Sequence, residues 1–66
     1  MIIAELIDAD SKASRGRAYL AETPFPGDTV ATAQAVYTVI RRRFLDLGPG
    51  EHTDRLSAEL IVRVLS

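Results

Sequence analysis

The stretch that decides the fold is residues 28–49, which read DTVATAQAVYTVIRRRFLDLGP. At 100° per residue, seven apolar side chains fall within one sector of ~120°, namely Val30, Ala33, Val36, Tyr37, Ile40, Phe44 and Leu47. Asp28 is a good N-cap, because its carboxylate can accept hydrogen bonds from the first turn of a helix. Gly48 stands where a helix-terminating glycine belongs, and Pro49 stops propagation. The pattern predicts an amphipathic helix over 29–47.

Two strands are predicted before this helix. Residues 2–7 form an apolar run rich in β-branched residues, with Glu5 as its one charge, which is typical of a central strand. A helix of one and a half turns is the alternative for this run. Residues 17–22 alternate between two faces and predict a second strand, antiparallel to the first. The Asp- and Ser-rich residues 8–16 between them predict a long hairpin loop.

A third strand is predicted over 55–65. Its apolar residues alternate onto one face, namely Leu56, Ala58, Leu60, Val62 and Val64. A helix capped by Thr53 or Asp54 is the alternative, because several of the same residues also fit helical spacing. Residues 49–54 predict a loop.

These elements predict a single small α+β domain over 1–66 with the order β-β-α-β. The third strand is expected beside the first, so that a three-stranded, mainly antiparallel sheet has the order 2-1-3. One amphipathic helix packs on one face of that sheet. The apolar first strand then lies in the centre, which agrees with its composition.

Length and composition exclude several classes of protein. A chain of 66 residues is one domain at most and buries only roughly 60% of the surface of its unfolded form. It has no cysteine, which excludes disulfides, zinc–thiolate sites and thiol catalysis. No apolar run approaches the ~18 residues that span a membrane. Met1 to Glu5 lacks the basic start of a secretory signal, so we expect a cytoplasmic protein.

No catalytic or metal-binding motif is complete. Asp8 and Asp10 begin like a calcium loop, but Lys12 stands where an oxygen ligand is needed. His52 is the only histidine and lies in a polar loop. Pro49 removes an N–H group that a phosphate-binding loop would need. We therefore expect no enzyme, no cofactor and no metal.

The basic residues raise an alternative function. Arg41, Arg42 and Arg43 are consecutive, and on a helix they would fan out rather than form one patch. The formal net charge of −1 also argues against a dedicated nucleic-acid binder. The alternative is a small nucleic-acid-binding domain that uses basic residues of the hairpin loop and helix end, namely Lys12, Arg15, Arg17 and Arg42.

The preferred expectation is a non-enzymatic protein-binding module or homodimer. Small residues continue along the outer face of the predicted helix, and the sheet has a second apolar face with nothing to cover it. Domains of this size without disulfides or metals are often stabilised by association. The predicted partner surface comprises Tyr19, Ala35, Val39, Arg42, Ile61 and Arg63. An inhibitor, an antitoxin or a small subunit encoded by a phage or other mobile element fits these features.

One segment resembles a known family. Pro26, Gly27, Asp28 and Thr29 precede an Ala-rich amphipathic helix after two strands. This arrangement resembles the N-terminal half of HicB-type antitoxins. The chain departs from that family by lacking one inserted strand and the appended DNA-binding domain. The resemblance implies an antitoxin-like, protein-binding role.

Overall fold

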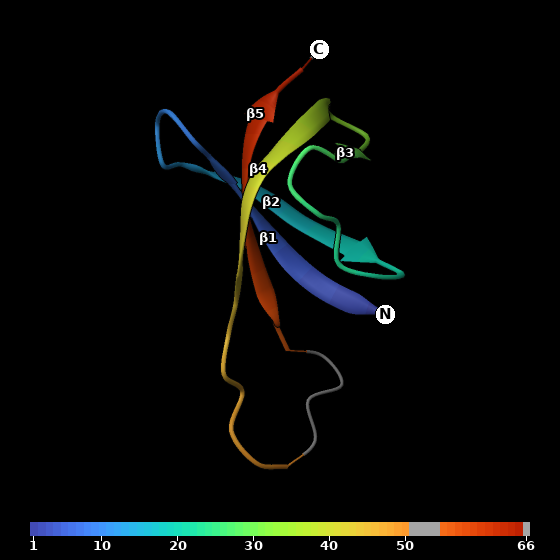
Figure 1. Cartoon of the computed structure of the whole chain (residues 1–66), viewed down its shortest axis with the longest axis vertical. Helices are drawn as coiled ribbons and strands as arrows, with labels where there is room; N and C mark the ends of the chain where they lie inside the picture. The colour runs from blue at the N-terminus through green and yellow to red at the C-terminus, as the bar shows by residue number, and fades with distance from the viewer. Residues whose placement is uncertain (51–54, 66) are drawn as a thin grey trace.

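The computed structural model describes residues 1–50 and 55–65, and its described part is all β (Figure 1). Five strands follow one another along the chain: β1 (Ile2–Asp8), β2 (Ser14–Leu20), β3 (Thr29–Ala31), β4 (Val36–Phe44) and β5 (Ala58–Val64). They form one mixed sheet in the order β2-β1-β5-β4-β3, which is twisted and curled into a half-barrel. The fold is therefore not the predicted α+β arrangement.

The predicted helix over 29–47 is wrong, because this stretch forms the β3–β4 hairpin instead. β4 is rich in β-branched and aromatic residues, which lose side-chain freedom in a helix and pack well on a pleated sheet. Tyr37 and Val39 alternate with partly exposed neighbours and are only 3% and 1% exposed. Alternate residues of the strand are therefore buried against distant parts of the chain. This long-range burial outweighs the helical spacing of the local sequence.

Asp28 and Gly48 take different roles from those predicted at helix ends. Asp28 N donates to the carbonyl of Phe25 (3.0 Å), and Gly27 has a φ of 96°, as a type II turn with Pro26 in second position requires. This turn leads directly into β3. Gly48 follows the end of β4 and has a φ of 73°. The HicB-like segment is thus a turn before a strand and not a helix start.

The first hairpin confirms the predicted antiparallel pairing of the first two strands. Its loop is shorter than expected, since β2 begins at Ser14. A bulge shifts the register between Glu5 and Ile7, opposite Gly16, whose φ of 96° suits a bulged strand. The observed β2 therefore includes residues 14–16, a third of the segment that was predicted to be loop.

The predicted third strand is present as β5, so the helical alternative for 55–65 is wrong. β5 lies beside β1, as expected, but the two strands are parallel rather than antiparallel. The reason is the extra hairpin. Each of the four connections between the five strands reverses the chain direction, and an even number of reversals leaves β5 parallel to β1. Because a helix was predicted in place of β3 and β4, the parallel direction of β5 relative to β1 was not predicted.

The core lies on one side of the sheet, which we call the inner face. Leu6 of β1, Val39 of β4 and Leu60 of β5 are at most 1% exposed on this side. The edge strands β2 and β3 contribute Ala18 and Val30 to the same cluster. Strands at opposite ends of a sheet can share one core only if the sheet curls, which explains the half-barrel.

The inner-face packing makes a testable prediction. Replacing Leu60 with Ala removes a fully buried side chain and should cost about 2–5 kcal/mol. That loss is a large fraction of the total free energy of unfolding, which is ~3–10 kcal/mol for a domain of this size. Urea unfolding followed by circular dichroism measures the change. Leu65→Ala is the control, because Leu65 is 60% exposed and should change stability by no more than ~0.5 kcal/mol. Equal losses in the two variants would contradict this core.

Candidate functional site

The sheet separates the predicted partner residues onto two faces. Side chains of paired residues point to the same side of a sheet, so the register assigns each one. Tyr19 pairs with Ile3, Ile61 with Ile7, and all of these lie on the face opposite the core, which we call the outer face. Arg63 follows Ile61 by two residues and lies there too. Arg42 pairs with Leu60 and lies on the inner face.

Two members of the predicted partner surface, Ala35 and Val39, pack in or against the core and do not lie on an exposed contact surface. Val39 is 1% exposed and belongs to the core, so it cannot lie on a protein-binding stripe. Ala35 ends the β3–β4 turn and packs against the same core. The stripe of small residues existed only on the predicted helix, and it disappears with that helix.

The four basic residues of the nucleic-acid alternative do not form one surface. Arg17 pairs with Glu5 on the outer face, whereas Arg42 lies on the inner face. Lys12 lies in the β1–β2 loop, where its Nζ donates to the carbonyl oxygen of Ala9 at 3.1 Å. Arg15 is held by Asp8. The sheet therefore disperses the predicted basic cluster.

Asp8 is the organising group of the β1–β2 loop. One carboxylate oxygen accepts hydrogen bonds from the backbone N–H groups of Asp10 (2.8 Å) and Ser11 (3.0 Å). The other accepts from Nη2 (2.8 Å) and Nε (3.2 Å) of Arg15. The Ser11 N–H, the Arg15 side chain and the Asp10 N–H together hold the pKa of Asp8 well below its usual range. In return, Asp8 raises the pKa of Arg15. This pair is structural.

The outer face carries a row of charges across four strands. Arg17, Glu5, Glu59 and Arg43 are successive partners in the register of β2, β1, β5 and β4. Arg43 is paired with Glu59, with 3.1 Å between Nη2 and Oε1. The two acidic residues stand in the middle and the two basic residues outside. Such a row favours a solvated face, and an exposed pair of this kind contributes little to stability.

A different group on the inner face has the character of a binding site. The guanidinium of Arg42 lies over the ring of Phe25, with 4.1 Å between the guanidinium carbon and the ring centroid. The same carbon lies 5.2 Å from the centroid of Phe44. Both rings are about three-fifths exposed, at 61% and 60%. We call Phe25, Arg42 and Phe44 the aromatic–Arg cluster.

Two local features place this cluster. A bulge between Val39 and Arg41 inserts Ile40 as an extra residue, after which Arg42 and Phe44 point to the inner side. The type II turn that begins at Phe25 lies beside β4, because Gly27 N donates to the carbonyl of Val39 (2.8 Å). The turn and the bulge together bring the two rings close to one cation.

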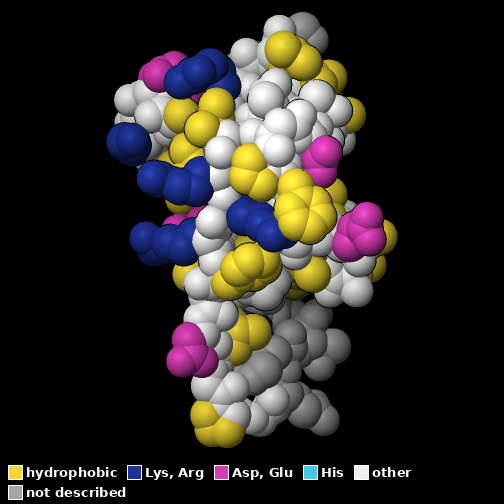
Figure 2. Space-filling model, in the orientation of Figure 1, with side chains coloured by type: hydrophobic (Ala, Val, Ile, Leu, Met, Phe, Trp, Pro, Cys, Tyr) yellow, Lys and Arg dark blue, Asp and Glu magenta, His cyan; other side chains and the backbone are white. Residues whose placement is uncertain are grey.

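The cluster is open to a ligand. Arg42 makes no ion pair with any residue in the described ranges 1–50 and 55–65, whereas Arg15, Arg43 and Arg63 each have an acidic partner there. Basic side chains gather along one side of the face in Figure 2 and meet exposed hydrophobic side chains near its middle. A guanidinium without an ion-pair partner in these ranges, close to two exposed rings, presents charge and apolar surface together, as interface anchors do.

Sequence reasoning selected Arg42 but missed its two neighbours. The sequence pattern placed Phe44 on the apolar face of the predicted helix, and Phe25 was not among the predicted site residues. The available signal was the density of β-branched and aromatic residues over 36–44, which favours a strand. The bulge at Ile40, however, has no local signature.

Other chemistry finds little support in the part of the chain that the structure describes. No three acidic or histidine residues there are grouped so as to hold a metal ion. Within the same residues, nothing helical is long and apolar enough to cross a membrane. His52, which was considered as a catalytic residue, lies outside the described residues.

Comparisons with models of known protein families, with curated proteins and with solved structures found no match to this chain.

The Asp8 clamp makes a prediction about pH. Because its pKa is lowered by folding, Asp8 stabilises the folded state above its unfolded pKa of ~3.9, and this contribution is lost as the pH falls. Asp8→Asn should therefore have a lower Tm than the wild type at pH 7. The difference should narrow below about pH 4. Asp10→Asn is the control in the same loop, since Asp10 is exposed. If the Tm difference between Asp8→Asn and the wild type stays constant across the pH range, the proposed stabilisation by the Asp8 carboxylate is wrong.

Proposed function

We propose that the chain is a small, non-enzymatic protein-binding module, and that the aromatic–Arg cluster is its contact surface. The observation that carries this proposal is a guanidinium that has no acidic partner among the described residues and that lies close to two rings, each about 60% exposed. Aromatic and Arg side chains are the most frequent anchors of protein interfaces. Neither Phe25 nor Phe44 belongs to the core, which lies mainly among the aliphatic residues of β1, β4 and β5. The two rings are therefore free to contact a partner.

The chemistry of the cluster describes the complementary partner surface. A carboxylate on the partner would pair with Arg42, because the guanidinium offers planar, bidentate N–H donors. An apolar side chain would pack against Phe25 and Phe44. Removal of water on binding would strengthen the contacts between Arg42 and the rings, which are worth ~0.5–1 kcal/mol at exposed sites and more when desolvated.

Composition and the present fold favour a protein partner over nucleic acid. The net charge is −1, and the sheet disperses Lys12, Arg15, Arg17 and Arg42. One observation still supports the alternative function, nucleic-acid binding. Exposed rings beside an Arg can also stack on the bases of a single strand. That function would require affinity that falls steeply with salt, through release of counterions.

The biological setting that we propose is an inhibitor, an antitoxin or a small subunit in the cytoplasm, encoded by a phage or another mobile element. Such proteins act by occupying a surface of a larger protein, which needs no catalytic group. A second copy of the chain is the other partner that the small size supports.

The contact surface is tested by affinity capture from lysate of the native host. We expect wild-type protein to retain one protein after nuclease treatment and at elevated salt. Arg42→Ala should weaken that complex by at least about 30-fold, which corresponds to the ~2 kcal/mol of an interface anchor. The retained protein is identified by mass spectrometry, and its affinity for each variant is measured by calorimetry.

Arg41→Ala is the matched control, because Arg41 pairs with Ile61 on the outer face and contacts neither ring. It should bind as the wild type does. Thermal unfolding of both variants separates lost binding from lost folding. Material that is released by nuclease would instead support the nucleic-acid alternative. Equal weakening by the two substitutions would exclude the cluster as the contact surface.

A further inference from the structure

A second feature, separate from the aromatic–Arg cluster, lies along the free edge of β3. Val39 N donates to the carbonyl of Asp28, and Thr32 N donates to that of Ala35, each at 2.9 Å. In an antiparallel pair, only every second residue bonds to its neighbour. Thr29 and Ala31 therefore point their backbone N–H and C=O groups away from β4. No residue in the described ranges bonds to these groups.

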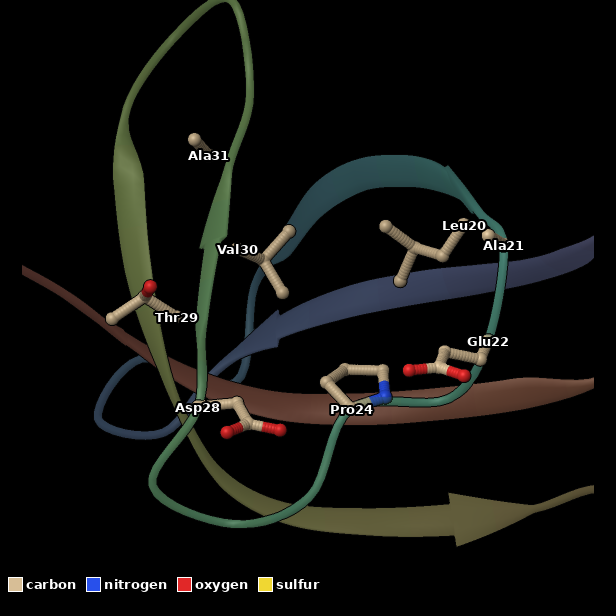
Figure 3. Close-up of a pocket in the computed structure, with 8 residues that line it drawn as sticks. All are labelled: Leu20, Ala21, Glu22, Pro24, Asp28, Thr29, Val30 and Ala31. Atoms are coloured by element: carbon tan, nitrogen blue, oxygen red, sulfur yellow. The ribbon is translucent and has the colours of Figure 1, made fainter.

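The same edge borders a hollow of ≈ 400 Å³ between β3 and the end of β2 (Figure 3). Leu20 and Val30 face each other across its upper part, and Pro24 forms another apolar wall. The hollow is therefore flanked by unpaired backbone groups on one side and by apolar side chains within. A strand laid along β3 would place its alternate side chains into this space.

Two carboxylates give the hollow its charge. Glu22 and Asp28 lie on either side of Pro24 in Figure 3 and are exposed. Neither forms an ion pair with any of the residues that the structure describes. Asp28 Oδ2 accepts a hydrogen bond from Phe25 N (2.8 Å), which fixes the carboxylate and leaves Oδ1 available. The hollow thus combines apolar walls with an unneutralised negative end, which is complementary to the stem and head of a basic side chain.

We propose that the edge of β3 binds an extended segment of a partner protein that carries a Lys or Arg residue. The segment adds a strand beside β3 and bonds to the backbone of Thr29 and Ala31. Its basic side chain enters the hollow, packs its stem between Leu20 and Val30, and places its charge between Glu22 and Asp28. This site shares no residue with the aromatic–Arg cluster, so it stands independently of the proposed function.

Charge also decides against a second copy as the occupant. A second β3 edge would bring Thr29, Val30 and Ala31 to the hollow, and none of these residues is basic. Glu22 and Asp28 would then have no cation to neutralise them. The other free edge, β2, carries Arg15 and Arg17 and is interrupted by a bulge, which are features that discourage strand addition. The β3 edge is only three residues long, but it carries neither a basic residue nor a bulge.

The test uses the whole chain and two short blocked peptides in which Val and Thr alternate. One peptide has a central Lys, and the other has Gln in its place. Binding is followed by NMR, with hydrogen exchange of the Thr29 and Ala31 amides as the readout. We expect the Lys peptide to bind, to slow exchange at these two amides, and to bind more tightly than the Gln peptide.

The double variant Glu22→Gln with Asp28→Asn should weaken the Lys peptide by about fivefold or more, since each exposed ion pair contributes modestly. Asp10→Asn is the control, because it removes a carboxylate far from the hollow and should leave binding unchanged. Arg42→Ala should also leave it unchanged, which separates this site from the proposed function.

Three results would overturn the proposal. The first is no saturable change at Thr29 and Ala31 with millimolar Lys peptide. The second is equal binding of the two peptides, or slowed exchange in β2 instead. The third is slowed exchange at Thr29 and Ala31 that rises with protein concentration in the absence of peptide. That last result would assign the edge to a second copy of the chain.

Discussion

The structure depends on the parallel pairing of β1 with β5 at the centre of the sheet. Among the residues that the structure describes, this pairing is the only strand-to-strand junction between the β1–β2 hairpin and the β3–β4–β5 meander. It aligns Leu6 with Leu60, and both side chains are at most 1% exposed. Because a two-stranded hairpin alone is marginally stable, the β1–β2 hairpin requires the meander to bury its apolar face. The curl of the sheet and the positions of both candidate sites follow from this junction.

The two bulges then determine which side chains remain outside the core. In β4 the extra residue Ile40 interrupts the alternation after Val39, so that Arg42 takes the inner-face position opposite Leu60, which Arg41 would take if the alternation continued. The half-barrel is open there, and the Arg side chain meets the rings of Phe25 and Phe44. In β2 the bulge beside Gly16 is associated with the contact between Arg15 and Asp8. The β4 bulge thus determines which arginine of the strand lies on the inner face.

The sequence predicted the strands at both ends of the chain and their proximity, but not the middle. The apolar run of β1 and the alternation of β5 are local signals that agree with the fold, and the antiparallel pairing of β1 and β2 followed from their order. Residues 29–47 satisfy both a helical and a two-residue period, and only burial of Tyr37 and Val39 against β5 selects the strand. Of the candidate site, Arg42 was predicted. Phe25 and Phe44 were not, because their proximity depends on a bulge and a turn that no local pattern specifies.

The division between core and surface explains how so short a chain can fold and still present recognition groups. The core uses aliphatic residues at the middle of β1, β4 and β5, together with Tyr37, and these positions cannot change without loss of stability. The β2–β3 connection, residues 21–28, lies outside that constraint and joins the two edges of the half-barrel. Phe25 points from this connection toward Arg42, whereas Glu22, Pro24 and Asp28 line the hollow beside β3. One exposed segment therefore contributes Phe25 to the aromatic–Arg cluster and both carboxylates to the hollow, and its sequence can vary for recognition while the sheet beneath it stays the same.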